Sequence, residues 1–561
     1  MSKANNQPIR PLPDWIKKLI NLSKFLVLRT GLLEILHLFT LLSARYLPNR
    51  SSVYVSELFL PMALIAPLLL LTYHQYFKIF KQPLLAHIAS FSMLYTYFHF
   101  EHHFQTSSGL AEALTPLKLN TTLETTVAVI GIKLVLSGIF AFVIGFLINY
   151  FKFIKSPQIM KVASFVIIFI FASQAYKIAD FNLRISDQTT FDYQIPDYTQ
   201  DKSKITTKPD IYYFVFDRYA SNAWLRDEYG FDNSEINNFL RDEGFTVKED
   251  ALSNYPFTGV SVSSTLAMEY HDAATGNFKE KLTTFPIRSI LNNPPVAQLL
   301  KQNGYTYYQN GSWWGSTSDK IKADVNLTSK GNLRLPGIDI SLTEFQELFN
   351  DKSIGSYLYQ PILKNVKISE FDRPITQLDN VKNLLNEESN QPKFVFSHIL
   401  LPHPPYLHGE KGDYPSYDIN ANDNDVDEKV KYISQLKYAN VLIKDIISSI
   451  RSKSPGAIII LQADEGPYPK EMRGKNFNQL TTIEELSDRS LQSKYTVQAA
   501  YYFPNPSSAA KINSSVDAFR VTLSDYLGYD MPSLPSCQYS GRALVNERLG
   551  ASLSPDCPVL E

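Results

Sequence analysis

Two adjacent carboxylates, Asp464 and Glu465, follow a run of buried-strand residues at 457–463 and precede a glycine and a proline. In an open α/β sheet, ligands bind beyond the carboxyl ends of the strands, so acids at this position lie where a site is expected. Neighbouring carboxylates repel one another unless a positive charge lies between them, and a divalent cation commonly supplies that charge. The alternative is a polar turn that only closes the strand.

Asp217 is a third acid in the same kind of position. It follows the continuous apolar and aromatic run 209–216, which is typical of a central parallel strand. Together with Asp464 and Glu465 it forms an oxygen-rich set that suits Mg²⁺ or Mn²⁺ better than Zn²⁺. We therefore predict one divalent cation, with Mn²⁺ or Mg²⁺ favoured over Zn²⁺. Arg218 is either a candidate for stabilising transition-state charge or a solvated or ion-paired residue.

A hydroxyl stands where a helix is predicted to begin. The segment 253–268 passes from a loop with Pro256 into a helix-compatible run, with Thr258 as a natural N-cap and Ser261 shortly after it. In most proteins such a hydroxyl is a plain cap. The functional interpretation is that the helix N–H groups bind an anionic phosphate while a metal activates the hydroxyl, which makes Thr258 a nucleophile.

Two histidines accompany the strand predicted at 393–398. His398 ends that strand, and a structural role is the simpler interpretation. His403 lies in a Pro-His-Pro-Pro-Tyr loop, where an imidazole can contact a substrate or act as an acid or base near neutral pH. The alternative is a loop histidine held between prolines.

The elements that would position these residues alternate between strand and helix. Apolar residues between 427 and 453 step by three and four, which indicates one helical face, and this helix leads into the strand at 457–463. Strand, helix and strand with short turns predict an α/β domain whose sheet is mainly parallel, with helices on both faces.

Charge and cysteine content bear on the partners and the compartment of the protein. The chain has 561 residues, with 54 Lys and Arg against 55 Asp and Glu, so no basic field favours a nucleic-acid partner. Cys537 and Cys557 both lie near the C-terminus. If that end lies outside the cytoplasm they could pair, and otherwise they are two free thiols.

The first third of the chain contains apolar segments, each close to the ~20 residues that a helix needs to cross a bilayer. They lie near residues 25–44, 57–75, 83–100, 126–149 and 162–179. The Lys and Arg residues of the lead and of most of the connections predict about five spans by the positive-inside rule, with the N-terminus inside and everything after Asp180 outside. The alternative is a set of buried helices in a soluble domain.

These patterns predict five regions. They are a cytoplasmic lead at 1–24, a transmembrane domain of about five helices at 25–180, a tether at 181–208, an α/β catalytic domain at 209–545 and a C-terminal tail at 546–561.

The order of the motifs resembles that of the alkaline phosphatase superfamily. Asp217 follows a strand, Thr258-x-x-Ser261 begins a helix, His403 lies in its proline loop, and Asp464-Glu465-Gly466 follows a strand. Within the superfamily the chain is similar to membrane-anchored sulfatase-like proteins, including lipoteichoic acid synthase and the lipid A phosphoethanolamine transferases. The resemblance covers the whole chain in architecture, and residues 209–275 and 393–545 in motif.

The resemblance implies a role for each of these residues. Asp217, Thr258, Asp464 and Glu465 would bind the metal, Thr258 would become phosphorylated, and His403 would contact the substrate head group or act as an acid or base. Beside these, we predict Arg218 and Ser261 as further residues that contact the substrate. The expected function is a transferase in a bacterial cytoplasmic (inner) membrane, with its C-terminal domain extracytoplasmic. It would move a phospho-alcohol head group from a membrane lipid, through Thr258, to an envelope glycan or lipid.

Two departures from the family pattern leave alternatives open. The family usually has Asp-His where this chain has Asp464-Glu465, which fits either a changed metal or a non-catalytic relative that binds a glycan or partner. The Cys/Ser-x-Pro-x-Arg signature that becomes formylglycine is absent around 258–265, which disfavours sulfate ester hydrolysis by that cofactor. A phosphodiesterase or phosphatase that uses the same site is the other enzymatic alternative.

Overall fold

The computed structural model describes residues 59–80, 157–184, 193–271, 285–327, 333–340, 370–417, 425–469 and 486–558, with short gaps in several of these ranges and a few isolated positions elsewhere. The chain forms two compact units. The N-terminal unit comprises Met1–Ser186 and Leu342–Ile362, and the C-terminal unit comprises Asp187–Ser341 and Leu363–Glu561.

Two long helices are described in the N-terminal unit, α3 (Phe59–Phe80) and α7 (Pro157–Arg184). They cover most of the apolar segments predicted at 57–75 and 162–179, whereas the segments at 25–44, 83–100 and 126–149 lie largely or wholly outside the described residues. No helix in the described part of the chain combines the length and the apolar composition that crossing a bilayer requires.

The C-terminal unit is built on a seven-stranded sheet in the order β2-β9-β8-β1-β7-β3-β4. β1 pairs in parallel with both β7 and β8, β3 pairs in parallel with β7 and β4, and β9 runs antiparallel to both β8 and β2. The mainly parallel sheet is therefore confirmed. In sheet order the strands are β2 (Thr246–Lys248), β9 (Ala499–Tyr502), β8 (Ile458–Gln462), β1 (Ile211–Phe216), β7 (Lys393–Ile399), β3 (Thr306–Asn310) and β4 (Val325–Asn326).

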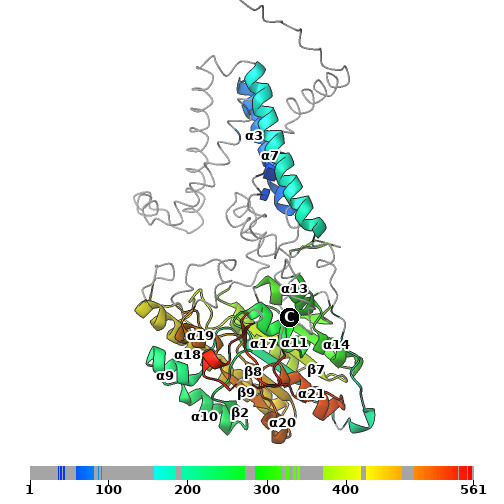
Figure 1. Ribbon diagram of the computed structural model, residues 1–561, viewed down its shortest axis with the longest axis vertical. Coiled ribbons are helices and arrows are strands. Elements are labelled where there is room, and N and C mark those ends of the chain that lie inside the picture. Colours follow the sequence, from blue (N-terminus) through cyan, green and yellow to red (C-terminus); the bar gives the residue numbers. More distant parts are fainter. Residues whose placement is uncertain are drawn as a thin grey trace, which may run out of the picture. The chain divides into compact units, whose positions relative to one another are not determined.

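Helices cover both faces of this sheet (Figure 1). Alternate residues of β1 point to opposite faces, so Phe214 joins the apolar core on one side and Tyr213 joins the core on the other. The first core includes residues of α9 (Asn222–Tyr229), α10 (Ser234–Asp242), α17 (Arg373–Leu385) and α18 (Asp425–Lys453). The second includes α11 (Thr258–Ala267), α13 (Phe285–Asn292), α14 (Pro295–Gln302), α20 (Pro506–Ala510) and α21 (Asp517–Leu527).

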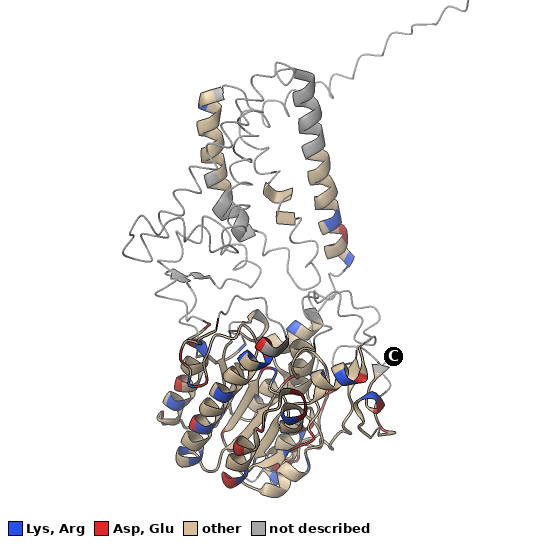
Figure 2. Cartoon of the chain, turned by 90° about the vertical axis from the view of Figure 1, so that its left-hand side faces the viewer, with Lys and Arg blue, Asp and Glu red and all other residues tan. Residues whose placement is uncertain are grey.

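Burial on both faces explains why the central strands read as continuous apolar runs. Every residue of β1, β7 and β8 is buried. Each fully buried large apolar side chain contributes about 1.5–3 kcal/mol relative to exposure. Figure 2 shows that Lys, Arg, Asp and Glu are spread over the outer helices of this unit.

The C-terminal unit also contains further helices and two hairpins that are separate from this sheet. They are α19 (Asp488–Tyr495), the short helices η4 (Lys202–Lys204), η6 (Gly315–Thr317) and η10 (Glu547–Leu549), and the hairpins β5 (Leu333–Leu335) with β6 (Ile338–Ile340) and β10 (Tyr539–Ser540) with β11 (Ala543–Leu544).

The segment before β1 and the C-terminal tail both pack against the C-terminal unit. Gln200, in the predicted tether, donates a hydrogen bond from Nε2 to the carbonyl of Leu527 at 3.0 Å. Cys537 and Cys557 form a disulfide with Cα atoms 5.7 Å apart, which ties the tail back to the segment before β10. The pairing that the sequence left open is therefore present.

Candidate metal centre

Asp217 and Asp464 lie side by side because of strand register. β1 and β8 pair in parallel with Val215 opposite Gln462, and each acid stands two residues further along its chain. Both acids are buried, with exposed fractions of 1% and 3%. The expectation that acids from distant parts of the chain meet at the carboxyl ends of the strands agrees with this geometry.

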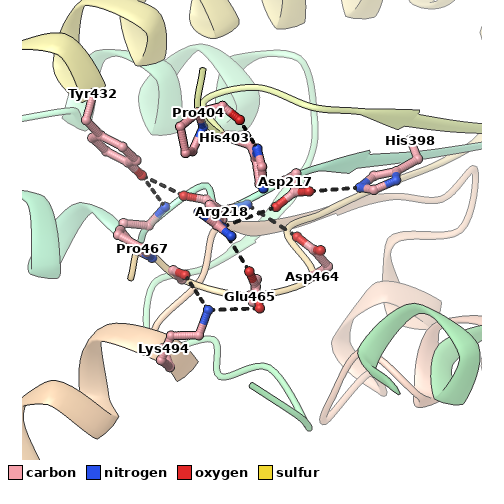
Figure 3. Close-up of polar contacts among 12 residues, drawn as sticks. Asp217, Arg218, His398, His403, Pro404, Tyr432, Asp464, Glu465, Pro467 and Lys494 are labelled. Carbon is pink, nitrogen blue, oxygen red and sulfur yellow. Dashed lines mark hydrogen bonds and ion pairs between the residues drawn. The ribbon is translucent and has the colours of Figure 1, made fainter. Parts of the chain in front are cut away.

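β7 brings a histidine to the same point. His398 lies opposite Val215 across the β1–β7 pair, and its Nε2 is 3.5 Å from Asp217 Oδ2. One ligand atom from each of Asp217, His398 and Asp464 lies within 4.8 Å of the others, and all three residues are buried (Figure 3). This is the group of three in the described residues that could hold a metal ion, and it includes a histidine that the sequence indicated as structural.

The donor atoms of this group fit a divalent cation. Asp217 Oδ1, Asp464 Oδ2 and His398 Nε2 are buried, and none makes a hydrogen bond within the described part of the chain. Leaving such polar atoms buried and unpaired is costly, and a bound cation would satisfy all three. Thr317 Oγ1 lies 2.7 Å from His398 Nδ1, so the second ring nitrogen is held while Nε2 faces the acids.

The two acids respond differently to this crowding. Burial raises the pKa of Asp464 to about 7, and the neighbouring carboxylates of Asp217 and Glu465 add to the rise. Burial also acts against ionisation of Asp217, but the neighbouring groups His403, His398 and Arg218 outweigh it and lower the pKa of that carboxyl. One oxygen of Asp217 and one of Asp464 lie within 4.8 Å of each other, so ionisation of one carboxyl opposes ionisation of the other. A divalent cation bound between them would keep both carboxyls ionised.

Thr258 reaches this centre from the N-terminus of α11. It is the first residue of the helix, and the N-cap is Phe257, one residue before the predicted cap. Thr258 acts to lower the pKa of Asp464, which indicates that its hydroxyl lies near that carboxyl group. Ser261 is buried one turn along, and no contact in the described part of the chain joins it to them.

Arg218 follows Asp217 in a left-handed backbone conformation, with φ of 63°. Such a conformation costs a non-glycine residue roughly 1–2 kcal/mol. Two hydrogen bonds hold it: the Arg218 amide donates to Asp464 Oδ1 at 3.3 Å, and the Tyr432 hydroxyl donates to the Arg218 carbonyl at 2.7 Å. The guanidinium stacks on Tyr468, with 3.6 Å from Cζ to the ring centroid.

Glu465 faces protein cations. Its Oε1 accepts a hydrogen bond from Arg218 Nε at 2.9 Å, and its Oε2 lies 2.8 Å from Lys494 Nζ (Figure 3). The sequence predicted Glu465 as a metal ligand, but Glu465 is not part of the group formed by Asp217, His398 and Asp464. Sequence reasoning missed Lys494, because a lysine inside an ordinary helical segment carries no local motif.

His403 lies beside the centre in a loop with two cis peptide bonds, Leu401–Pro402 and Pro404–Pro405. Burial and the charge of Arg218 disfavour its protonated form and lower the pKa of the imidazole to about 4, although Asp217 acts in the opposite direction. His403 therefore lies near Arg218 and Asp217 as a neutral base. It also lines an open hollow of about 310 Å³, together with residues that include Glu370, Arg373 and Gln435.

The fold and the centre together define a class of protein. A mainly parallel sheet with helices on both faces holds buried acids at its carboxyl edge and a hydroxyl at a helix N-terminus, which is the arrangement expected of the alkaline phosphatase superfamily. The sulfatase family model matches residues 223–510, slightly more than half of the chain. The chain belongs to the sulfatase family, and thereby to that superfamily of hydrolases and group transferases.

Solved structures that resemble the chain share little sequence with it. The C-terminal periplasmic domain of EptC from Escherichia coli, in complex with Zn, is 12% identical over 60% of this chain and 86% of that chain, with a TM-score of 0.37. The phosphoethanolamine transferase EptC domain from Campylobacter jejuni is 14% identical over 61% and 94%, with a TM-score of 0.36. The lipooligosaccharide phosphoethanolamine transferase EptA from Neisseria meningitidis is 11% identical over 91% and 95%, with a TM-score of 0.39. No curated protein matches the sequence.

Proposed function

We propose that this chain is a membrane-bound, metal-dependent transferase that moves a phospho-alcohol head group from a membrane lipid to an envelope acceptor through Thr258. The observation that carries the proposal is the position of Thr258, which begins α11 and lies near enough to Asp464 to act on the pKa of that carboxyl. A helix N-terminus favours an anionic phosphoryl group, and an acid partner holds the hydroxyl in place for attack.

The proposed ligands of the cation are Asp217, His398, Asp464 and Thr258. When bound, a divalent cation supplies Lewis-acid stabilisation of charge on the phosphoryl oxygens and on the attacking hydroxyl. Mn²⁺ and Mg²⁺ suit the oxygen ligands, and the imidazole of His398 extends the range to Zn²⁺. Glu465 remains the other ligand candidate from the sequence, although its oxygens face Arg218 and Lys494.

The chemistry has two balanced steps. In the first, Thr258 Oγ forms a bond to phosphorus, the bond from phosphorus to the lipid alcohol oxygen breaks, and the threonine proton is transferred to that oxygen. In the second, an acceptor hydroxyl attacks the same phosphorus, the bond to Thr258 breaks, and the acceptor proton returns to the threonine. His403 is assigned to carry the proton, because it borders the centre as a neutral base.

The location of the reaction is also part of the proposal. α3 has Lys78 as its only Lys, Arg, Asp or Glu residue, and α7 has none between Lys161 and Lys177. From the five apolar segments of the sequence we propose about five spans, with the C-terminal unit outside the cytoplasmic membrane of a bacterium. The Cys537–Cys557 disulfide supports that side, because disulfides persist in oxidising compartments. Anchoring would favour a lipid donor, since it raises the effective concentration of molecules confined to the same surface.

The proposal is tested by incubating the full chain, purified in detergent with Mn²⁺, with phospholipids labelled in the head group. Peptide mass spectrometry should find the phospho-alcohol increment on Thr258. Thr258→Ala removes the attacking oxygen, so transfer should fall by at least about a thousandfold. Asp464→Asn should lose both bound metal and label.

Other results would assign other functions. Label that reaches Thr258 and is then released to water alone would indicate a phosphodiesterase. A chain that binds no divalent metal and takes up no label from any donor would contradict the enzyme and favour a non-catalytic binding protein.

A further inference from the structure

Three charged side chains, of which two are buried and the third is slightly exposed, lie next to the candidate metal centre. Glu465 stands between two cations, with Oε1 2.9 Å from Arg218 Nε and Oε2 2.8 Å from Lys494 Nζ. The Glu465 and Lys494 side chains are 1% and 0% exposed. Both cations also lie against one aromatic ring, because Arg218 Cζ and Lys494 Nζ are 3.6 and 3.8 Å from the Tyr468 centroid.

Stability alone gives a poor account of this arrangement. Taking ions out of water is costly, and replacing a buried ion group by apolar side chains is often neutral or stabilising. A fold that keeps three such charges together therefore invites a functional explanation. Lys494 and Arg218 differ in whether they have hydrogen-bond donors left for a ligand.

Lys494 is fully engaged. Besides Glu465, its Nζ donates to the carbonyl of Gly466 at 3.3 Å, and it lies over the rings of Tyr468 and Phe257. With no exposed surface, it cannot reach a ligand. Its effect is to neutralise the charge of Glu465 and to hold that carboxylate in position.

Arg218 is only partly engaged. Glu465 takes its Nε, Tyr468 covers one face of the guanidinium, and the side chain remains 11% exposed. Neither terminal nitrogen makes a hydrogen bond to a residue in the described part of the chain. A guanidinium fixed at Nε presents these two donors as a fork, which matches the geometry of a tetrahedral oxyanion.

The fork belongs to the reacting centre. The Arg218 amide bonds to Asp464 Oδ1 at 3.3 Å, and the charge of Arg218 acts on the imidazole of His403 (Figure 3). The left-handed backbone breaks the strand alternation, so that neighbouring side chains need not point to opposite faces. Asp217 and Arg218 accordingly both face the centre, with 3.9 Å between Asp217 Oδ1 and Arg218 Nε.

The charges indicate which oxyanion fits. Asp217 and Asp464 balance a divalent cation, and Glu465 balances Lys494. Arg218 then contributes one unbalanced positive charge. A ligand with a single negative charge, such as a phosphodiester or a sulfate monoester, would neutralise the site, whereas a phosphate monoester dianion would leave an excess charge in a poorly solvated place.

We propose that Glu465 and Lys494 together position Arg218 to bind a non-bridging oxygen of a singly charged phosphoryl or sulfuryl ester, and that Glu465 is not a ligand of the metal. This inference rests on the proposed function, which supplies the metal and the ester. Glu465 is thus a positioning residue, and Arg218 is the residue that touches the substrate.

The test uses the full chain in detergent and two calorimetric titrations, one with Mn²⁺ alone and one with dimethyl phosphate in the presence of Mn²⁺. Arg218→Lys keeps the charge and removes the fork, so affinity for dimethyl phosphate should fall about tenfold. Glu465→Gln keeps the shape and removes the anchoring charge. It should weaken dimethyl phosphate binding to a similar extent, while the Mn²⁺ affinity stays within about threefold.

Matched controls lie in exposed ion pairs. Arg241 pairs with Glu249, and Glu410 lies 2.7 Å from Lys437, all with partly or fully exposed side chains. Arg241→Lys and Glu410→Gln should change neither titration. Asp464→Asn sets the scale for the loss of a metal ligand.

The outcomes separate this inference from the proposed function. If Glu465→Gln loses Mn²⁺ as severely as Asp464→Asn, Glu465 is a ligand and the inference is wrong. It is equally wrong if the unchanged chain does not bind dimethyl phosphate, or if Arg218→Lys binds it normally. An unchanged chain that binds no Mn²⁺, or is never labelled at Thr258, would instead overturn the proposed function. Should Glu465→Gln fail to fold, the charge-conserving variants Arg218→Lys and Lys494→Arg decide the matter, with Lys494→Arg expected to weaken dimethyl phosphate binding alone.

Discussion

The orientation of one imidazole decides whether His398 can serve the metal centre. Its Nδ1 lies 2.7 Å from Thr317 Oγ1, and that hydroxyl is itself 2.7 Å from Ser312 Oγ. A ring held at one nitrogen presents the other in a fixed direction, here toward Asp217. At the scale of single residues, Thr317 therefore matters to the metal without touching it.

Thr317→Val tests that dependence. The substitution keeps the shape of the side chain and removes the hydroxyl, so the ring of His398 loses its fixed tautomer and direction. We expect the Mn²⁺ affinity of the full chain, measured by calorimetry, to fall about tenfold. Thr522→Val, which removes a buried hydroxyl bonded to the Ala518 carbonyl at 2.8 Å, is the matched control and should leave Mn²⁺ binding unchanged. Unchanged affinity in Thr317→Val would remove His398 from the ligand set.

Residues differ in how far their positions follow from sequence. Asp217 and Asp464 were predictable because each comes within two residues of the end of a strand, and the carboxyl ends of parallel strands share one edge. His398 lies inside β7, so its approach to Asp217 depends on the β1–β7 register, which no local pattern reveals. The partners of Glu465 were hidden for a similar reason, because Lys494 comes from α19 and Arg218 from the end of β1.

At the scale of elements, a glycine lets the loop after β8 pass against α19. A Cβ built on Gly466 would lie 1.9 Å from the Ser493 carbonyl oxygen and 3.1 Å from that of Thr496. Both obstacles are backbone atoms, and the Gly466 amide donates to the Lys494 carbonyl at 2.8 Å. The contact places Glu465 and Lys494 side by side.

Gly466→Ala should therefore destabilise the chain strongly, because α19 or the loop must move to admit the methyl group. We expect a loss of about 3 kcal/mol in the free energy of unfolding, at the upper end of typical overpacking costs. Denaturant titration followed by circular dichroism measures it. Gly456→Ala is the control, since nothing lies within 4 Å of its Cβ position, and it should change stability by less than about 1 kcal/mol. Equal midpoints for the two variants would contradict the close approach.

Elements with strong local patterns agree with the structure, and elements without them were missed. The strands predicted at 209–216, 393–398 and 457–463 correspond to β1, β7 and β8, and the helix predicted between 427 and 453 corresponds to α18. β2 and β9 were not predicted. They have three and four residues, and their place at the antiparallel edge of the sheet is set by pairing with distant chain.

At the scale of the whole molecule, the compartment of the C-terminal unit follows from the chain's path across the membrane, which remains a proposal. The Cys537–Cys557 disulfide gives an independent test of that compartment. Cys537 and Cys557 are 0% and 8% exposed, so chemical oxidants reach them poorly once the unit has folded, and their pairing reflects the compartment in which folding occurs.

In bacterial cells that express the full chain, we expect Cys537 and Cys557 to be paired. Cells are quenched in acid, denatured and alkylated before and after reduction, and the mass of the tail peptide reports the thiols. Alkylation should appear only after reduction if the unit folds outside the cytoplasm, because the cytoplasm keeps thiols reduced. The control is a chain that lacks residues 1–186. This shortened chain should stay in the cytoplasm, and its cysteines should be alkylated without prior reduction. Direct alkylation of the full chain would place the C-terminal unit on the cytoplasmic side and exclude an envelope acceptor.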